Sequence, residues 1–108
     1  MPVIVFARGV HQNWDELVKT GANALSIDWN VDILKISHEI PSNIALQGNL
    51  DPALLTASPS IATEKTKIIL DSMKNRNGFI FNLGHGVPPN ASIDTINAVN
   101  NTVQSYGK

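Results

Sequence analysis

The stretch "ALSIDWNVDILKISHEIPSNIALQ", Ala24 to Gln47, decides the fold because it holds a strand, a helix and another strand in that order. Residues 24–28 and 44–47 are short apolar runs, typical of strands buried on both faces. Between them Asp32 is placed to cap a helix and Pro41 to end it. The apolar residues of that helix recur at spacings of three and four: Ile33, Ile36 and Ile40. A helix-length connection between two buried strands predicts a parallel βαβ unit.

The same order continues on both sides of this unit. "VIVF" (Val3 to Phe6) and "FIFN" (Phe79 to Asn82) predict a first and a fourth strand. Helices are predicted after the first strand, from Ser58 to about Lys74, and after Ser92. The last two helices are expected to bury Ile61, Ile69, Leu70, Met73, Ile93, Ile96, Val99 and Val103. The chain therefore predicts an α/β fold of four consecutive βα units with parallel strands.

Two architectures fit four such units. One is a small doubly wound sheet, and the other is a contiguous half of a (β/α)8 barrel. We expect residues 1–108 to form a single segment, since no linker or low-complexity stretch interrupts them. A full barrel takes roughly 250 residues, and a buried strand that begins only two residues into the chain suggests a piece of a longer fold. Both observations favour the half-barrel.

The composition narrows the class of protein. Apolar residues make up 43% of the chain and charged residues 16%, which is ordinary for a protein with a globular core. The net charge is −1, so the composition predicts no cationic face for nucleic acid or anionic lipid. The absence of cysteine excludes disulfides and thiolate metal sites. Apolar runs such as residues 3–7 are too short to span a bilayer, and no signal peptide is recognisable. We expect a cytoplasmic protein with neither a nucleic-acid nor a membrane partner.

Polar residues come at or after the end of every predicted strand. Because the carboxyl ends of parallel strands form the ligand-binding face of such folds, these residues are expected to share one rim. They are Arg8, Asp28, Gln47, Asn49, Asn82 and His85. Each has a structural alternative: Asp28 could cap a helix or hold a loop, Gln47 and Asn49 could satisfy backbone groups, and Arg8 could pair with a carboxylate.

His85 stands out because glycines flank it in "LGHG". Gly84 and Gly86 contribute no side chain to packing, and they allow a backbone to approach a ligand closely. An imidazole acts near neutral pH as donor, acceptor or cation. The pattern favours a binding or catalytic role for His85, and the spacing of the three histidines predicts no metal site.

Three motifs in order, "IDWNVD" (27–32), "LQGNLDP" (46–52) and "FNLGHGVPP" (81–89), closely resemble the C-terminal part of uroporphyrinogen decarboxylase. The resemblance covers essentially all 108 residues. It implies that the chain is the C-terminal half of a TIM barrel whose whole enzyme is a homodimer. It also implies that His85 lies in the substrate cleft and contacts carboxylate or pyrrole groups, with Gly84 and Gly86 matching the glycines of that loop.

The family resemblance implies a reaction as well. Uroporphyrinogen decarboxylases remove the four acetate carboxyl groups of uroporphyrinogen III and give coproporphyrinogen III in haem biosynthesis, without metal or organic cofactor. Protonation of a pyrrole carbon beside the acetate arm makes the ring an electron sink for the departing CO₂. The protein must then hold a highly anionic tetrapyrrole and supply protons.

The chain also departs from the family pattern. The family's arginine-rich loop, pyrrole-binding aspartate, cleft tyrosine and serine or threonine belong to earlier βα units and have no counterpart here. The first loop, "ARGVHQN" (7–13), is also less like the family than the other three. We therefore expect no decarboxylase activity from this chain alone. A half-barrel leaves two strand edges unpaired, so we expect either a homo-oligomer or association with the missing N-terminal half.

Two other functions are compatible with the same fold. A corrinoid methyltransferase shares this barrel, but such relatives hold zinc partly through cysteine, including one where this chain has His85. A non-catalytic βα module that acts through protein contacts is an alternative from a different class. It would fold cooperatively and show no affinity for tetrapyrroles.

Overall fold

The computed structural model describes residues 1–6, 14–84 and 86–107. Its centre is one sheet of four parallel strands, hydrogen-bonded in sequence order β1-β2-β3-β4. The strands are β1 (Ile4–Phe6), β2 (Ala24–Ser26), β3 (Ala45–Leu50) and β4 (Phe79–Leu83). The predicted four strands and their parallel direction are confirmed. The third strand is longer than predicted, because Gly48, Asn49 and Leu50 continue its pairing with β4.

A helix follows each strand, and their first residues are largely those that the sequence indicated. The helices are α1 (Trp14–Val18), α2 (Ile33–Glu39), α3 (Pro59–Met73) and α4 (Ile93–Ser105), with a short 3-10 helix, η1 (Pro52–Thr56), after β3. The Asp32 carboxylate accepts a hydrogen bond from the Leu34 amide at 3.0 Å and caps α2. Ser92 caps α4 in the same manner.

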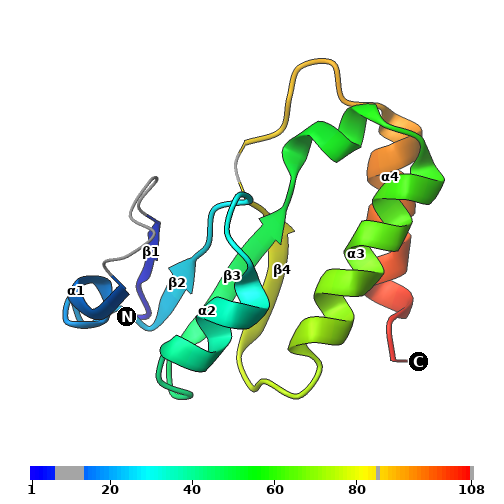
Figure 1. Ribbon diagram of the computed structural model, residues 1–108. Coiled ribbons are helices and arrows are strands. Elements are labelled where there is room, and N and C mark those ends of the chain that lie inside the picture. Colours follow the sequence, from blue (N-terminus) through cyan, green and yellow to red (C-terminus); the bar gives the residue numbers. More distant parts are fainter. Residues whose placement is uncertain (7–13, 85, 108) are drawn as a thin grey trace.

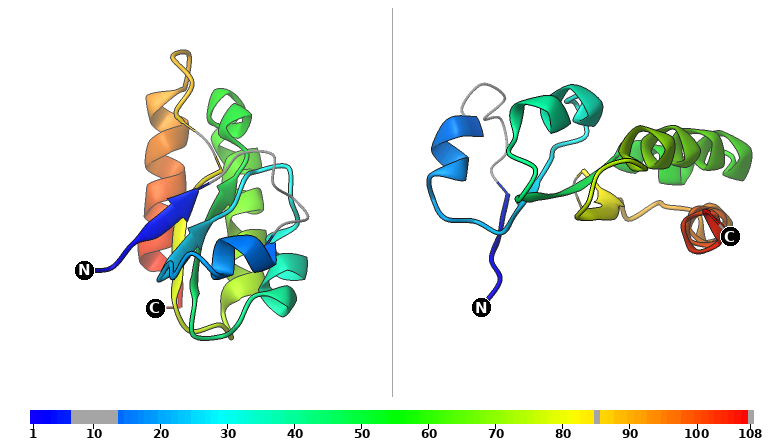
Figure 2. Two further views of the ribbon diagram at one scale, coloured as in Figure 1. Left: turned by 90° about the vertical axis from the view of Figure 1, so that its left-hand side faces the viewer. Right: turned by 90° about the horizontal axis from the view of Figure 1, so that it is seen from below.

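The helices cover one side of the sheet. Figure 2 shows α1, α2 and α3 on that side, with α4 beyond the β4 edge and beside α3. The loops after β2, β3 and β4 gather at one end of the sheet (Figure 1). Sequential strand order with helices on a single side excludes the doubly wound sheet and agrees with part of a TIM barrel. No helix in the described ranges has the length and apolar character that crossing a membrane requires.

The core lies between the sheet and this helical layer. Val5, Leu25, Leu46 and Phe79 form one row across the four strands and face the helices. Leu25 and Leu46 are fully buried and contact a cluster from α1 and α2 that includes Trp14, Ile33, Ile36 and Ile40. The isoleucines predicted from the spacing in α2 therefore pack as expected.

Part of the apolar side predicted for α3 and α4 is exposed. Ile61 on α3 and Ile93 and Ile96 on α4 are exposed, whereas Ala62, Thr66 and Thr95 are buried. The two helices pack mainly against each other and not across the sheet. Small residues permit that close contact, and the larger isoleucines are left outside it.

Arg76, in the loop between α3 and β4, connects several segments at the end of the sheet where β3 and β4 begin. Its guanidinium donates hydrogen bonds of 2.7, 3.1 and 2.9 Å to the carbonyl oxygens of Ser37, Pro41 and Ile44. These carbonyls belong to the end of α2 and to the loop that leads into β3. Partial burial lowers the pKa of Arg76 through desolvation of its charge. One side chain thus fixes α2 to the start of two strands.

Replacing this arginine tests that role. We expect Arg76→Ala to lower the free energy of unfolding by about 2 to 4 kcal/mol, because three carbonyls lose a charged donor. Lys74→Ala, two residues earlier and exposed, is the matched control and should change it by less than about 0.5 kcal/mol. Urea denaturation followed by tryptophan fluorescence measures both. Equal effects from the two variants would contradict the assignment.

Candidate functional site

A depression lies at the carboxyl ends of the strands, on the side of the sheet that the helices leave open. It has a volume of about 240 Å³ and is lined by Phe6, Ser26, Asn82, Leu83, Gly84 and Gly86. We call it the rim depression. Phe6 and Ser26 share a pleated row with Gln47 and Ile80, and Asn82 follows Ile80 by two residues on the same face. The sheet curves enough that β1 and β4 both line it, although two strands separate them.

The loop after β2 forms one border of this end of the sheet, and Asn49 holds it. The buried Asn49 amide nitrogen donates to the carbonyl oxygens of Asp28 at 2.9 Å and Val31 at 2.6 Å. Asp28 is also buried, and its carboxylate accepts from the Trp29 amide at 2.8 Å. The structure thus places Asn49 against the Asp28 backbone, and both side chains bind backbone groups of this loop, which is the structural alternative for each.

Gly84, directly after β4, contacts the same loop after β2. Its amide donates to the Leu50 carbonyl at 2.8 Å, which extends the pairing of β4 with β3. A Cβ atom at Gly84 would lie 2.6 Å from both the Cα and the Cβ of Trp29, so no side chain fits there. The close approach that this glycine permits is to the loop after β2. A Cβ atom at Gly86 would meet nothing within 4 Å.

The other predicted rim residues take different positions. The Gln47 amide nitrogen donates to the Ser26 hydroxyl at 3.2 Å, so this pair lies on the open face below the rim. The Asn82 carboxamide oxygen accepts from the amide of Leu83 at 2.8 Å, and its exposed side chain lines the depression. Arg8 and His85 lie outside the described residues, so their roles stay predictions.

Sequence reasoning missed three lining residues of the depression: Phe6, Ser26 and Leu83. Ser26 precedes Asp28 by two residues, and the two-residue period of a strand could have placed both on one face. Phe6 gave no signal because an apolar side chain is ordinary in a buried strand. The six described residues that line the depression are uncharged.

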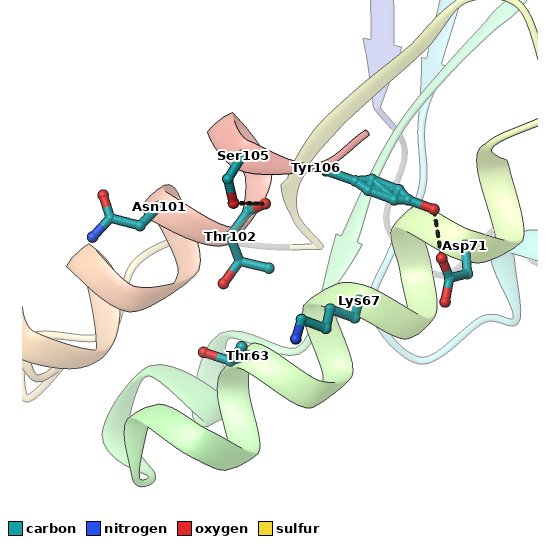
Figure 3. A pocket seen from close by; sticks show the side chains of 7 residues that line it. All are labelled: Thr63, Lys67, Asp71, Asn101, Thr102, Ser105 and Tyr106. Carbon is teal, nitrogen blue, oxygen red and sulfur yellow. Dashed lines mark hydrogen bonds between the residues drawn. The ribbon is translucent and has the colours of Figure 1, made fainter. Parts of the chain in front are cut away.

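A second hollow lies between α3 and α4 (Figure 3). It has a volume of about 390 Å³ and is lined by residues with polar or charged side chains. The Tyr106 hydroxyl donates to the Asp71 carboxylate across it, and Lys67 points toward the same space (Figure 3). None of the predicted site residues that the structure describes lines it. The residues described contain no group of three or more His, Asp or Glu arranged to hold a metal ion.

The family model of uroporphyrinogen decarboxylase (URO-D) matches residues 1–106 of this chain. The chain belongs to the uroporphyrinogen decarboxylase family. The resemblance carried by its three motifs is thereby confirmed. The rim depression lies in the part of the fold from which two of these motifs come, since Ser26 precedes "IDWNVD" and Gly84 and Gly86 belong to "FNLGHGVPP".

Curated relatives named uroporphyrinogen decarboxylase agree with the family match. A protein of Vesicomyosocius okutanii is 32% identical over 108 residues, which is 100% of this chain and 31% of that protein. One from Magnetococcus marinus is 36% identical over 107 residues, with 99% and 30% covered. One from Burkholderia cenocepacia is 35% identical over 108 residues, with 100% and 30% covered. The chain therefore spans about a third of the length of the relatives it matches.

The two glycines of the "LGHG" segment should differ in how well they tolerate an added side chain. Gly84→Ala is expected to lower the free energy of unfolding by about 1 to 3 kcal/mol, because its methyl group would overlap the Trp29 backbone. Gly86→Ala is the matched control, and its methyl group enters open space, so we expect a change below about 0.5 kcal/mol. Urea denaturation compares the two. A neutral Gly84→Ala would show that the loop after β2 is not held against β4.

The contact between Tyr106 and Asp71 should appear in a pH titration. The hydrogen bond to the Asp71 carboxylate, with desolvation and the nearby negative charge, raises the pKa of Tyr106 above its ordinary value. Its stabilising contribution is therefore complete below the pKa of the unfolded chain and is lost as the pH rises through the higher folded pKa. Tyr106 is the only tyrosine, so absorbance near ~295 nm reports it alone. We expect Asp71→Asn to move the transition to lower pH, and an unmoved transition would contradict the contact.

Proposed function

We propose that this chain is the C-terminal portion of a uroporphyrinogen decarboxylase and supplies one wall of its substrate site. The whole enzyme would convert uroporphyrinogen III to coproporphyrinogen III by removing four acetate carboxyl groups, with neither metal nor organic cofactor. The observation that carries the proposal is the family match over residues 1–106, with relatives of that name aligned over nearly the whole chain.

The rim depression supports this assignment by its position and shape. It opens at the carboxyl ends of parallel strands, where barrel enzymes bind their substrates. Two of its lining residues are the glycines of "LGHG", and His85 stands between them in the sequence. Gly86 leaves open space beside the backbone, so a pyrrole ring of the substrate could approach there without displacing a side chain.

The chemistry assigns different tasks to the rim residues. His85 and Arg8 are the candidates to contact the substrate, since they follow or interrupt the lining segments and can donate charged hydrogen bonds to carboxylates. Asn82 and the Ser26–Gln47 pair would add uncharged donors on the open face. Asn49 and Asp28 would act indirectly, since their hydrogen bonds hold the loop beside the depression.

This wall alone does not provide a complete site for a substrate with eight carboxylates. The chain has eight Lys and Arg residues in total, and none of the described ones lines the rim depression. The family's other substrate contacts belong to parts of the relatives that this chain does not span. We therefore expect the purified chain to show no turnover of uroporphyrinogen.

A chimera tests the proposal directly. The 108 residues would replace the matching segment of the Burkholderia cenocepacia relative, and coproporphyrinogen formation would be measured by fluorescence after oxidation. We expect the chimera to be active, because the missing walls are then present. His85→Gln should lower its kcat/KM by about 10- to 100-fold, which corresponds to one charged hydrogen bond.

His38→Gln is the matched control in the same chimera. His38 is exposed in the last turn of α2, so the same substitution there should leave activity unchanged. A folded chimera without activity would contradict the proposed function. Equal loss from both histidine substitutions would contradict the role of His85. Turnover by the isolated chain would show that its own residues complete the site.

A further inference from the structure

We propose that Asn77 is a site of spontaneous deamidation, at which the asparagine converts to isoaspartate and aspartate through a cyclic imide formed with Gly78. The two residues lie in the loop that joins α3 to β4, at the end of the sheet where β3 and β4 begin (Figure 1). Asn77 and Gly78 form the only Asn-Gly pair in the 108 residues. Both residues are exposed, so water reaches the carboxamide and the peptide bond between them.

The reaction needs a backbone amide that is not held in a hydrogen bond, and the Gly78 amide meets this condition. The Leu46 amide donates to the Gly78 carbonyl at 2.9 Å, so the pairing of β3 with β4 begins at this residue. In a regular parallel ladder the Gly78 amide would donate to the Ile44 carbonyl. That carbonyl instead accepts from the Arg76 guanidinium at 2.9 Å, and among the described residues the Gly78 amide has no hydrogen-bond partner.

The Asn77 carboxamide and the glycine that follows it are also suited to ring closure. The exposed Asn77 side chain makes no hydrogen bond within the part of the chain that the structure describes. Gly78 has a φ of +76°, which glycine adopts without strain, and a Cβ atom there would lie 3.1 Å from the Cβ of Ala45. Backbone conformation and packing therefore both require the glycine, which has no side chain to hinder attack by its nitrogen.

The chemistry requires only water as a co-reactant. The Gly78 amide loses its proton, and its nitrogen forms a bond to Cγ of Asn77 while the bond from Cγ to Nδ2 breaks and ammonia leaves. Water then adds to one of the two carbonyl carbons that flank the ring nitrogen. Cleavage of the bond from this nitrogen to the main-chain carbonyl carbon of Asn77 gives isoaspartate, and cleavage of its bond to Cγ gives aspartate. In each product a carboxylate has replaced the carboxamide.

The location of Asn77 gives the modification a structural consequence. Arg76 on one side is fixed by its three carbonyl partners, and Gly78 on the other side is fixed by its hydrogen bond from Leu46. Isoaspartate adds one carbon atom to the backbone between these two fixed residues and leaves a carboxylate next to Arg76 in the sequence. We expect the added length and charge to disturb the Arg76 contacts, so the modified chain should unfold at a lower urea concentration than the fresh chain.

Mass spectrometry of the 108-residue chain during incubation at mildly alkaline pH tests the inference. We expect a mass gain of about 1 Da, which peptide mapping places at Asn77 and resolves into isoaspartate and aspartate. Asn75 is the internal control, because it is exposed in the same loop but the amide that follows it, that of Arg76, donates to the Met73 carbonyl at 3.0 Å. Asn75 should react at least about tenfold more slowly, since the Arg76 side chain also hinders ring closure.

Asn77→Gln should remove the mass gain, because glutamine has to close a larger ring that forms more slowly. The same incubation of the Burkholderia cenocepacia chimera should give the same products, because the loop and both of its fixed ends lie within this chain. An unreactive Asn77 in either protein, equal rates at Asn75 and Asn77, a gain that persists in Asn77→Gln, or aspartate without isoaspartate would each overturn the inference. Equal urea midpoints for the fresh and the modified chain would contradict the structural consequence.

Discussion

The Asn49 carboxamide donates both of its hydrogens to the loop after β2, one to the Asp28 carbonyl and one to the Val31 carbonyl. A buried amide without partners would destabilise the fold, so β3 and this loop are fixed in one arrangement. The position of Trp29 follows from it, and Gly84 can then approach the Trp29 backbone. The border of the rim depression depends on this chain of contacts.

The arrangement of the helices on one side of the sheet explains why the candidate site is incomplete. One side of the sheet is filled by helices and carries the core, whereas the other side carries the depression and few packing partners. The open face is shaped as the inner surface of a barrel and not as an outer surface. Its exposed Ile4, Phe6 and Ile80 are ordinary residues for a barrel interior and unusual ones for a free face.

Much of the fold could be predicted because it follows from local rules. Apolar strands, Asp32 and Ser92 at helix starts, and helix-length connections indicated four parallel βα units. The exposed sides of α3 and α4 could not be predicted, since the spacing of apolar residues along a helix does not show which other element that apolar side packs against. Likewise, nothing local to Arg76 indicates that it binds carbonyls more than 30 residues away. In the site, polar strand ends indicated Asn49 and Asn82, but Phe6 has no polar signal at all.

The central claim is that the rim depression is the wall on which the tetrapyrrole lies. Amide chemical shifts of the labelled chain, recorded while coproporphyrin is added, test it most directly. The account predicts that the shifts change at Ser26, Asn82, Gly84 and Gly86 and stay unchanged at Lys67 and Thr102 in the hollow between α3 and α4. Changes centred on that hollow, or none at the rim, would contradict it.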